Sequence, residues 1–285
     1  MALLHVVRRE PQQFGHAASR WQLSSILQSS PWLHLTSLGG LSKLLKRLDI
    51  VYKGGRSYLH SPDQHYEAKV SYLDRCRQRA QADPQRYVFV YIDEVAFSRQ
   101  PSLAKAYEQV GHHQPLARRS YRKDTLCRAI GALNALTGQV TYRQASRISL
   151  KVLSGFYAAL RADYPQAEVI YAAQDNWPVH VHPDVLARLQ PQTFPFWPNT
   201  PDNWPNRPHP RAVRDQLPIQ LVFLPTYASW LNPIEKLWRW LRQKVLHLHR
   251  LSDDWLTLKQ LVLDFMAQFR AGSQELLHYV GLLPY

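Results

Sequence analysis

Short apolar runs recur along the second half of the chain, and they are almost uninterrupted by polar residues. Runs of this kind are typical of strands buried on both faces of a sheet. Two further extended stretches are joined by a connection that contains glycine, which indicates a hairpin. The pattern predicts five strands, at residues 87–92, 125–134, 138–145, 168–173 and 219–224.

A second pattern, with apolar residues three and four positions apart, lies between and after these strands and predicts helices. The predicted helices cover residues 149–162, 183–190 and 233–246, and a further helix at about 254–270 closes the chain. The resulting order is β-β-β-α-β-α-β-α, the order of an α/β fold of the ribonuclease-H-like type. In such a mixed five-stranded sheet with flanking helices, the first and fourth strands are neighbours. Their C-terminal ends therefore converge.

Residues 1–60 have a different character. Helical spacing predicts helices at 20–27 and 41–48, separated by a segment that contains Pro31 and two glycines. Two helices joined in this way favour a small helix-turn-helix module, with residues 50–59 as a β-wing of winged-helix type. The alternative is a pair of ordinary helices whose lysines face solvent.

The predicted domain organisation has three parts and one insertion. Residues 1–60 form the N-terminal module, and residues 61–85 form a polar linker helix. Residues 86–285 form the main domain, in which the segment 191–218 contains eight prolines and predicts an irregular insertion.

Composition limits the class of protein. The formal net charge is +14 and the pI is about 9.9, which favours a polyanionic partner such as nucleic acid, although a basic protein without such a partner stays possible. The two cysteines, Cys76 and Cys127, do not form a CxxC pair, which argues against a zinc ribbon or a disulfide framework. No apolar run approaches the length of about 20 residues that spans a bilayer, so we expect a cytoplasmic protein with no membrane partner.

Three acidic residues follow or begin predicted elements at comparable places. Asp93 ends the first strand, Asp175 ends the fourth, and Glu235 stands in the first turn of the helix at 233–246. Each alone has an ordinary explanation: a strand terminator beside Glu94, a turn, or an acid stabilised by the helix dipole. Together they predict an all-oxygen pocket, which suits Mg²⁺ or Mn²⁺. In a basic chain, the substrate predicted for such a metal site is a nucleic-acid phosphodiester.

One ambiguity concerns the second acid, because the tetrapeptide Asp-Asn-Trp-Pro occurs twice, at residues 175–178 and 202–205. Either Asp175 or Asp202 could be the ligand. Asp175 follows a strand, whereas Asp202 is surrounded by prolines and polar residues. Because rigid elements hold metal ligands better than loops do, the sequence favours Asp175.

The chemistry that fits such a pocket is phosphodiester cleavage or transfer with two divalent ions. Two ions about 4 Å apart activate the attacking oxygen and stabilise the leaving oxygen. Several carboxylates from different strands are needed to offset the repulsion between the ions. In this scheme Asp93 bridges the two ions, and Asp175 and Glu235 each complete one side.

The motifs around the three acids resemble those of a known family. The run LPTYASWLNPIEKLW at residues 224–238 is similar to the last catalytic motif of the mariner-related DDE transposases, in their bacterial insertion-sequence branch, the IS630 family. The run VYIDEVAF at 90–97 resembles the first motif, and Asp175-Asn176 followed by His180 or His182 resembles the second. The resemblance covers roughly residues 20–250.

This resemblance implies a metal-dependent DNA transposase that cleaves the donor strand at the element ends. The freed 3′-hydroxyl then attacks target DNA. Carried over to this sequence, the catalytic and metal-binding residues are Asp93, Asp175 and Glu235, supported by Asn176, Asn232 and Pro233. The implied cofactor is Mg²⁺ or Mn²⁺, as two ions.

The implied partners are double-stranded DNA, namely the terminal inverted repeats and the target, and a second copy of the chain in a homodimer on DNA. The implied location is the nucleoid in a bacterial cytoplasm.

Two departures from the family lead to an alternative. The proline-rich insertion lengthens the spacing between Asp175 and Glu235, and the N-terminal region has room for one helix-turn-helix where the family generally has two. A catalytically silent DNA-binding remnant or regulator of an insertion element is therefore the second hypothesis. A nuclease of the same fold that acts on RNA–DNA hybrids or junctions is a third, disfavoured by the motif around Glu235.

Basic side chains in three clusters are the predicted DNA contacts. One cluster lies in the N-terminal module, one precedes the second strand, and one lies on the helix that begins at 233, where tryptophans 230, 238 and 240 are interleaved. Those tryptophans either stack on unpaired bases or pack the helix on the sheet, and we favour packing. The predicted DNA-binding residues are Lys43, Lys46, Arg47, Lys53, Arg56, Arg118, Arg119, Arg122, Lys123, Arg239, Arg242 and Lys244.

Overall fold

The computed structural model describes residues 2–54, 60–213 and 216–283. The chain divides into two compact units, Met1–Tyr58 and Leu59–Tyr285. Each unit has its own apolar cluster.

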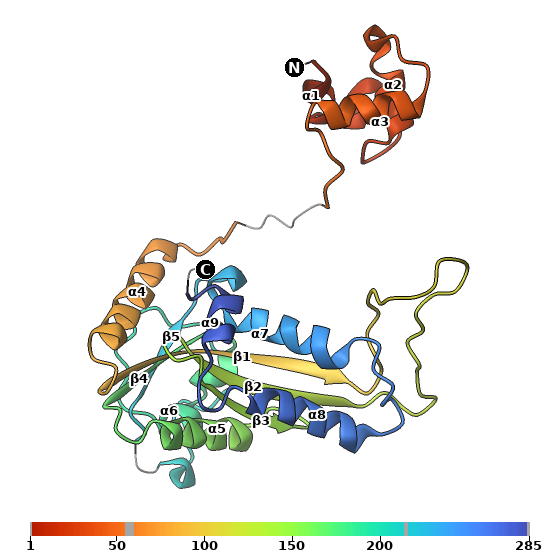
Figure 1. The fold of residues 1–285 in the computed structure, drawn as a ribbon. Helices are drawn as coiled ribbons and strands as arrows, with labels where there is room; N and C mark the ends of the chain where they lie inside the picture. The colour runs from red at the N-terminus through yellow and green to blue at the C-terminus, as the bar shows by residue number, and fades with distance from the viewer. Residues whose placement is uncertain (1, 55–59, 214–215, 284–285) are drawn as a thin grey trace. The chain divides into compact units, whose positions relative to one another are not determined.

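The N-terminal unit is helical in its described residues (Figure 1). It contains α1 (Ala2–Val7), α2 (Leu23–Gln28) and α3 (Leu38–Arg47). The α3 helix begins where the Ser37 hydroxyl accepts a hydrogen bond from the Gly40 amide, at 3.1 Å. Leu3, Ile26 and Leu41 from the three helices meet in its core. The two helices predicted from spacing are present, and α1 was not predicted.

The predicted wing is not confirmed. Residues 50–54 form no strand, and Arg56, with the rest of 55–59, lies outside the described residues.

The second unit is built on a five-stranded sheet with the order β3-β2-β1-β4-β5. β1 pairs with β2 and β2 with β3 in antiparallel fashion, whereas β1–β4 and β4–β5 are parallel. The predicted mixed sheet, with the first and fourth strands adjacent, is therefore confirmed. The strands are β1 (Tyr87–Ser98), β2 (Leu126–Asn134), β3 (Val140–Ala145), β4 (Val169–Gln174) and β5 (Ile219–Phe223).

The first strand is longer than predicted, because it continues six residues beyond Ile92 to Ser98. The prediction that Asp93 ends this strand is wrong. The parallel pairing with β4 stops at Tyr91↔Ala173, whereas the antiparallel pairing with β2 continues from Asp93↔Gly131 to the end. Asp93 therefore lies where β1 leaves β4 and stays paired on its other edge.

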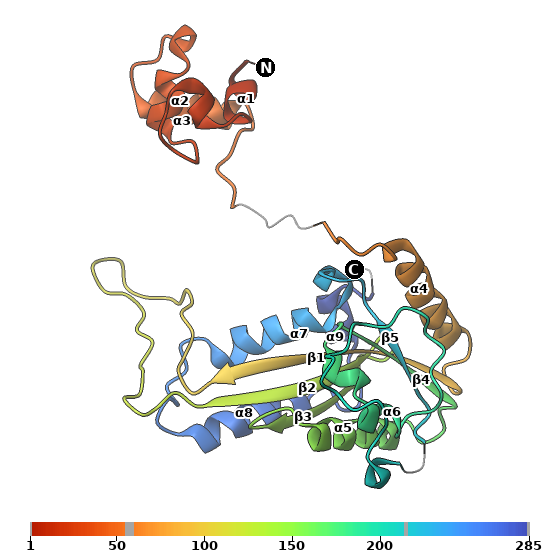
Figure 2. The same cartoon turned by 180° about the vertical axis from the view of Figure 1, so that it is seen from behind.

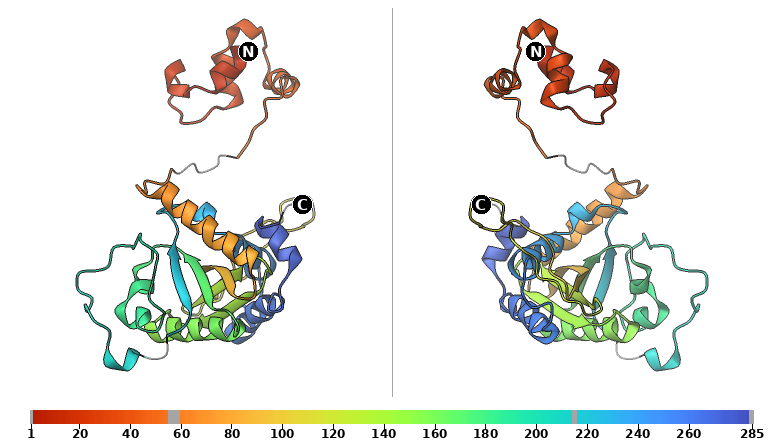
Figure 3. Two further views of the ribbon diagram at one scale, coloured as in Figure 1. Left: turned by 90° about the vertical axis from the view of Figure 1, so that its left-hand side faces the viewer. Right: turned by 90° about the vertical axis from the view of Figure 1, so that its right-hand side faces the viewer.

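Helices cover both faces of the sheet, with α5 (Leu150–Asp163) and α7 (Ile234–Leu241) on opposite sides (Figures 1 and 3). The predicted helix at 233–246 is divided: α7 continues as a π-helix at Arg242–Leu246. The predicted helix at 183–190 is only one turn. The remaining helices are α4 (Tyr66–Ala82), α6 (Pro183–Leu186), α8 (Trp255–Ala267) and α9 (Gln274–Val280), of which α9 was not predicted.

Two long connections lie outside this framework. The described residues of the segment 191–218 contain a short 3-10 turn, Pro210–Ala212, and an isolated bridge from Leu217 to Leu189, and Phe194 within the segment is buried against Phe223. The β1–β2 connection projects from the unit as a long loop (Figure 2). Its base is closed by paired hydrogen bonds between Gln100 and Ser120. No helix in the described part of the chain is long and apolar enough to cross a membrane.

Candidate active site

The three predicted acids come from three elements of the second unit. Asp93 lies within β1, Asp175 follows the last residue of β4, and Glu235 is the second residue of α7. Their charges interact: Glu235 raises the pKa of Asp93, and Asp175 raises the pKa of Glu235. The fold therefore places the three acids close enough for the charge of Glu235 to act on Asp93 and that of Asp175 to act on Glu235.

Burial and crowding disfavour the charged forms of these acids. Burial, followed by the Glu94 and Glu235 charges, raises the pKa of Asp93 to about 7, against a hydrogen bond from Trp238 that lowers it. Asp175 reaches solvent, but the protein around it still excludes enough water to raise its pKa, and the Glu94 charge adds to this. For Glu235, burial also raises the pKa, and Arg239 partly offsets it.

Asp93 is held by a tryptophan on α7. The Trp238 indole N–H donates to Asp93 Oδ2 at 2.9 Å, and the ring is buried. The ring fits because the residue opposite Asp93 on β2 is Gly131, where a β-carbon would stand 2.7 Å from Trp238 Cη2. Packing of the helix on the sheet, the favoured role for Trp238, is therefore correct, and the ring also fixes the carboxylate.

Two asparagine amides tie the acid-bearing segments to one another. Asn176, next to Asp175, donates from Nδ2 to the carbonyl of Leu224 at 2.8 Å, just after β5. Asn232, three residues before Glu235, donates to the carbonyl of Ile92 at 3.2 Å, one residue before Asp93. Each tie ends on a main-chain oxygen. Asn232, predicted only as motif-supporting, thus joins the segment of Glu235 to that of Asp93, and Asn176, predicted in the same way, joins the segment of Asp175 to the start of the 224–238 run.

The turn that leads to α7 is anchored by the segment before α4. Asp63 Oδ2 accepts from the Thr226 amide at 2.9 Å and from Lys69 Nζ at 2.8 Å. The Ser61 hydroxyl donates to the Thr226 carbonyl at 2.6 Å. Burial alone would raise the pKa of Asp63, but hydrogen bonds from Lys69, Thr226 and His65 lower it to about 2.

The next residue on β1, Glu94, points to the opposite face of the strand, as alternation predicts. There its Oε1 lies 3.3 Å from Nε2 of the fully buried His180. Ligand atoms of Glu94, Asp175 and His180 all lie within 4.8 Å of one another. The sequence predicts no role for Glu94 beyond its place next to Asp93, and it does not distinguish His180 from His182. Only the tertiary structure distinguishes the two histidines, since His182 instead caps α6.

Asp202 does not join this group. It is exposed, within the proline-rich segment.

The predicted basic clusters lie on surfaces wherever they are described. Lys43, Lys46 and Arg47 are exposed on α3, and Lys53 is exposed just after it. A second group projects from the long β1–β2 loop, and a third lies on α7 and its π-helical extension. The exposed residues of these two groups are Arg118, Arg119, Arg122, Lys123, Arg239, Arg242 and Lys244.

The tryptophans near the third group differ. Trp230 is 52% exposed, whereas Trp240 stacks on Tyr279 with ring centroids 4.5 Å apart. Trp240 therefore packs against α9, and only Trp230 presents a free ring.

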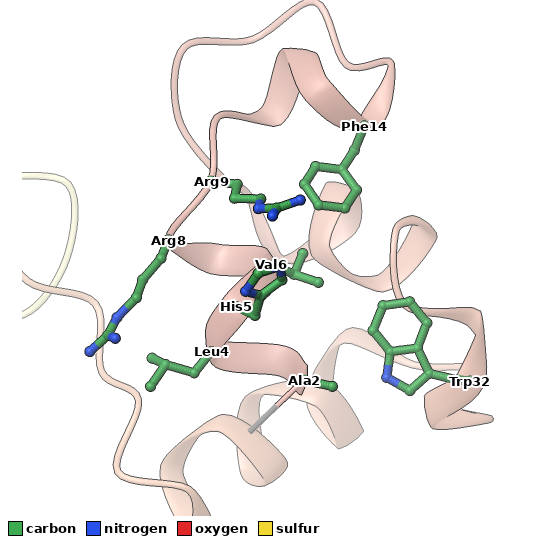
Figure 4. A pocket seen from close by; sticks show the side chains of 8 residues that line it. All are labelled: Ala2, Leu4, His5, Val6, Arg8, Arg9, Phe14 and Trp32. Carbon is green, nitrogen blue, oxygen red and sulfur yellow. The ribbon is translucent and has the colours of Figure 1, made fainter.

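A pocket of about 650 Å³ in the N-terminal unit contains none of the acids discussed above (Figure 4). Its lining is apolar and basic, with Leu4, Phe14 and Trp32 beside Arg8 and Arg9. It lacks the carboxylates that the predicted chemistry needs.

The donor set of the acidic group fits a divalent cation. Four carboxylates from β1, β4 and α7 interact, and the buried oxygens Glu94 Oε1 and Asn232 Oδ1 have no hydrogen-bond partner among the described residues. Oxygen donors of this kind suit Mg²⁺ and Mn²⁺. A bound cation would offset the mutual repulsion that raises the pKa of these acids.

Comparison with known families decides the class of the protein. Residues 88–259 match the model of the DDE superfamily endonucleases. The chain belongs to the DDE superfamily endonuclease family. The match begins in β1 and includes all three acids, and it shows that the chain is a DDE-type endonuclease.

Individual relatives agree with this assignment. The chain is 20% identical to the insertion element IS630 uncharacterized 39 kDa protein of Shigella sonnei, over 278 residues, which cover 96% of this chain and 73% of that protein. The pre-cleavage Mos1 transpososome is similar with a TM-score of 0.60 and 16% identity, covering 99% of this chain and 72% of that one. The Mos1 mariner paired-end complex with Mn gives 0.58 and 17%, covering 98% and 73%.

The likeness to the Mos1 structures shows a shared fold and confirms the predicted ribonuclease-H-like architecture. The family match and the similarity to the IS630 protein confirm the predicted resemblance to DDE transposases of the IS630 type.

Proposed function

We propose that this DDE endonuclease is a DNA transposase that cleaves the ends of an insertion element and joins them to target DNA. The observation that supports the proposal best is the convergence of Asp93, Asp175 and Glu235 from β1, β4 and α7. Both asparagine ties between their segments involve residues of the family-like motifs.

The family implies dependence on a divalent cation, and we propose two ions, Mg²⁺ or Mn²⁺, held by Asp93, Asp175 and Glu235. When bound, the cations activate the attacking oxygen and stabilise the leaving oxygen of the phosphodiester. Trp238 holds one carboxylate oxygen of Asp93 in place, and the asparagine ties keep the other acids in register with it. Such fixed geometry is what a site of this kind needs from its protein.

The proposed nucleic-acid partners are the terminal inverted repeats and the target DNA, within a bacterial nucleoid. The Mos1 structures with similar fold include a paired-end complex with the left transposon end and a strand transfer complex. The exposed basic residues of α3, of the long loop and of the π-helical extension give this chain three surfaces for phosphates. We further propose that two copies act together as a homodimer on DNA.

The test uses linear DNA carrying the sequences that flank this gene, incubated with the full chain and Mg²⁺ or Mn²⁺. We expect metal-dependent strand cleavage, and we expect Asp93→Asn to lower it by more than about a thousandfold while DNA binding persists. Cleavage that is equal in Asp93→Asn and wild type contradicts the site. Binding without any cleavage by the wild type supports the alternative of a silent DNA-binding remnant.

A further inference from the structure

Glu94 on the second face of β1 and the buried His180 beside it point to a site that the three-acid scheme does not contain. His180 is fully buried, and its Nε2 lies 3.3 Å from Glu94 Oε1. Neither atom has a hydrogen-bond partner among the described residues. Two buried polar atoms thus approach each other closely without satisfying each other.

The other ring nitrogen of His180 explains which atom faces Glu94. The Tyr157 hydroxyl donates to Gln174 Oε1 at 3.2 Å, which uses its only proton. Its oxygen lies 3.1 Å from His180 Nδ1, and with the hydroxyl proton already used the two atoms form a hydrogen bond only if Nδ1 donates. The ring proton is therefore on Nδ1, and the lone pair is on Nε2. Histidines that bind metals are usually oriented in this way: one ring nitrogen donates a hydrogen bond to a protein group, and the other binds the metal.

The third member of the group is Asp175, whose carboxylate lies beside both side chains. One ligand atom from each of Glu94, Asp175 and His180 falls within 4.8 Å of the others. Ligands on opposite sides of one cation stand about 4 Å apart, since metal–ligand distances are about 2.0–2.2 Å. A small closure of the two carboxylates therefore brings all three donors to one ion.

From this geometry we infer that Glu94, Asp175 and His180 form a carboxylate–imidazole site for one divalent transition-metal ion. Imidazole suits transition metals, whereas Mg²⁺ prefers oxygen alone, so the site favours Mn²⁺ over Mg²⁺. Glu94 and His180 belong to no predicted catalytic set, and Asp175 is shared with the three-acid site. The inference rests on the proposed function only through that shared residue.

The experiment is pulsed electron paramagnetic resonance of Mn²⁺ bound to the full-length chain without DNA. A nitrogen bonded to Mn²⁺ modulates the spin echo, and replacing ¹⁴N-histidine by ¹⁵N-histidine changes the modulation frequency. We expect this isotope-dependent modulation in the wild type. The labelling requires no substitution and so does not depend on a variant folding.

Variants then identify the histidine. His180→Asn abolishes the histidine modulation, and it weakens Mn²⁺ binding about tenfold or more, with a smaller effect on Mg²⁺. Tyr157→Phe keeps the aromatic ring at position 157 but removes the hydroxyl that pairs with His180 Nδ1. We expect this variant to bind Mn²⁺ about tenfold more weakly. His182→Asn is the matched control: His182 lies two residues away, caps α6, and its replacement leaves the modulation unchanged.

Two results overturn the inference. One is a wild type whose Mn²⁺ shows no histidine modulation, which leaves His180 and Glu94 as an ion pair. The other is modulation that survives in His180→Asn. Either result leaves the proposed function intact if cleavage still depends on Asp93. Conversely, the wild type could show histidine modulation while Asp93→Asn cleaves DNA as well as the wild type. That result retains this metal site and rejects the proposed function.

Discussion

The tetrapeptide Asp-Asn-Trp-Pro stands at residues 175–178 and again at 202–205, and the two copies have different surroundings. The first follows β4, and its asparagine is bonded to the carbonyl of Leu224. The second lies in the proline-rich segment, where its aspartate and asparagine are exposed. Each tryptophan packs on a histidine, Trp177 on His180 and Trp204 on His182. Identical residues therefore acquire different roles through the element that precedes them.

The largest expected effect is on DNA cleavage, and it distinguishes the two copies of the tetrapeptide. Asp175→Asn removes a charge from the three-acid site, and we expect DNA cleavage to fall by about a thousandfold or more. Asp202→Asn makes the same chemical change in the exposed copy, and cleavage is expected to stay within about twofold of wild type. Single-turnover cleavage assays compare the two variants. If Asp202→Asn is the inactive variant, the assignment of the second acid is wrong.

The second prediction concerns the support behind the first acid. A methyl group at position 131 stands 2.7 Å from the buried Trp238 ring, so we expect Gly131→Ala to lower the free energy of unfolding of the second unit by about 1–3 kcal/mol. Cleavage falls as well, because Trp238 no longer holds Asp93. Denaturant unfolding followed by tryptophan fluorescence measures the first effect.

The control for that variant is Gly39→Ala on α3, where an added methyl meets nothing within 4 Å. A glycine-to-alanine change inside a helix stabilises it by up to about 1 kcal/mol. Equal destabilisation by the two variants contradicts the packing argument.

Sequence predicted the order of the strands and the convergence of the acids, because the apolar runs are long and the acids stand at fixed points along them. It did not predict the extension of β1. Asp93 and Glu94 interrupt the apolar run, so the pattern predicts that the strand ends there. The strand continues because it pairs with β2, which lies more than 30 residues away in the sequence.

The same limit applies to the contact between Glu94 and His180. Spacing shows that a histidine follows Asp175, but only packing against Tyr157 decides that it is His180 rather than His182. The short helices α1 and α9 have too few turns to give a clear apolar period.

A third prediction tests the anchor of the turn before α7 by pH. Because the pKa of Asp63 is lowered to about 2, its ionised form stabilises the fold above the ordinary carboxyl pKa of about 4. This stability is lost as pH falls through the folded-state value. We expect wild type to exceed Asp63→Asn in free energy of unfolding by about 2 kcal/mol near neutral pH, with the difference disappearing between about pH 4 and pH 2.

The comparison variant is Asp74→Asn, which removes an exposed i,i+3 pair with Arg77. It is expected to cost less than about 1 kcal/mol near neutral pH. Chemical denaturation at a series of pH values separates the two variants. A constant difference between wild type and Asp63→Asn down to pH 2 contradicts the role of the Asp63 charge.

The smallest effect again contrasts the two copies of the tetrapeptide. Asn176→Ala removes the hydrogen bond to Leu224 and is expected to cost about 1 kcal/mol of unfolding free energy. Asn203→Ala changes an exposed residue, and the cost should stay within about 0.5 kcal/mol. The midpoints of urea unfolding of the two variants are measured in parallel. Equal midpoints would mean that the hydrogen bond from Asn176 to Leu224 does not stabilise the fold.

Both asparagine ties end on main-chain oxygens, those of Ile92 and Leu224. A carbonyl oxygen is present whatever side chain its residue has. Positions 92 and 224 can therefore exchange one apolar side chain for another of similar volume over evolutionary time without moving the acids. In Asn176 and Asn232, by contrast, the donor is the side chain. We therefore expect these two asparagines to be conserved in the family.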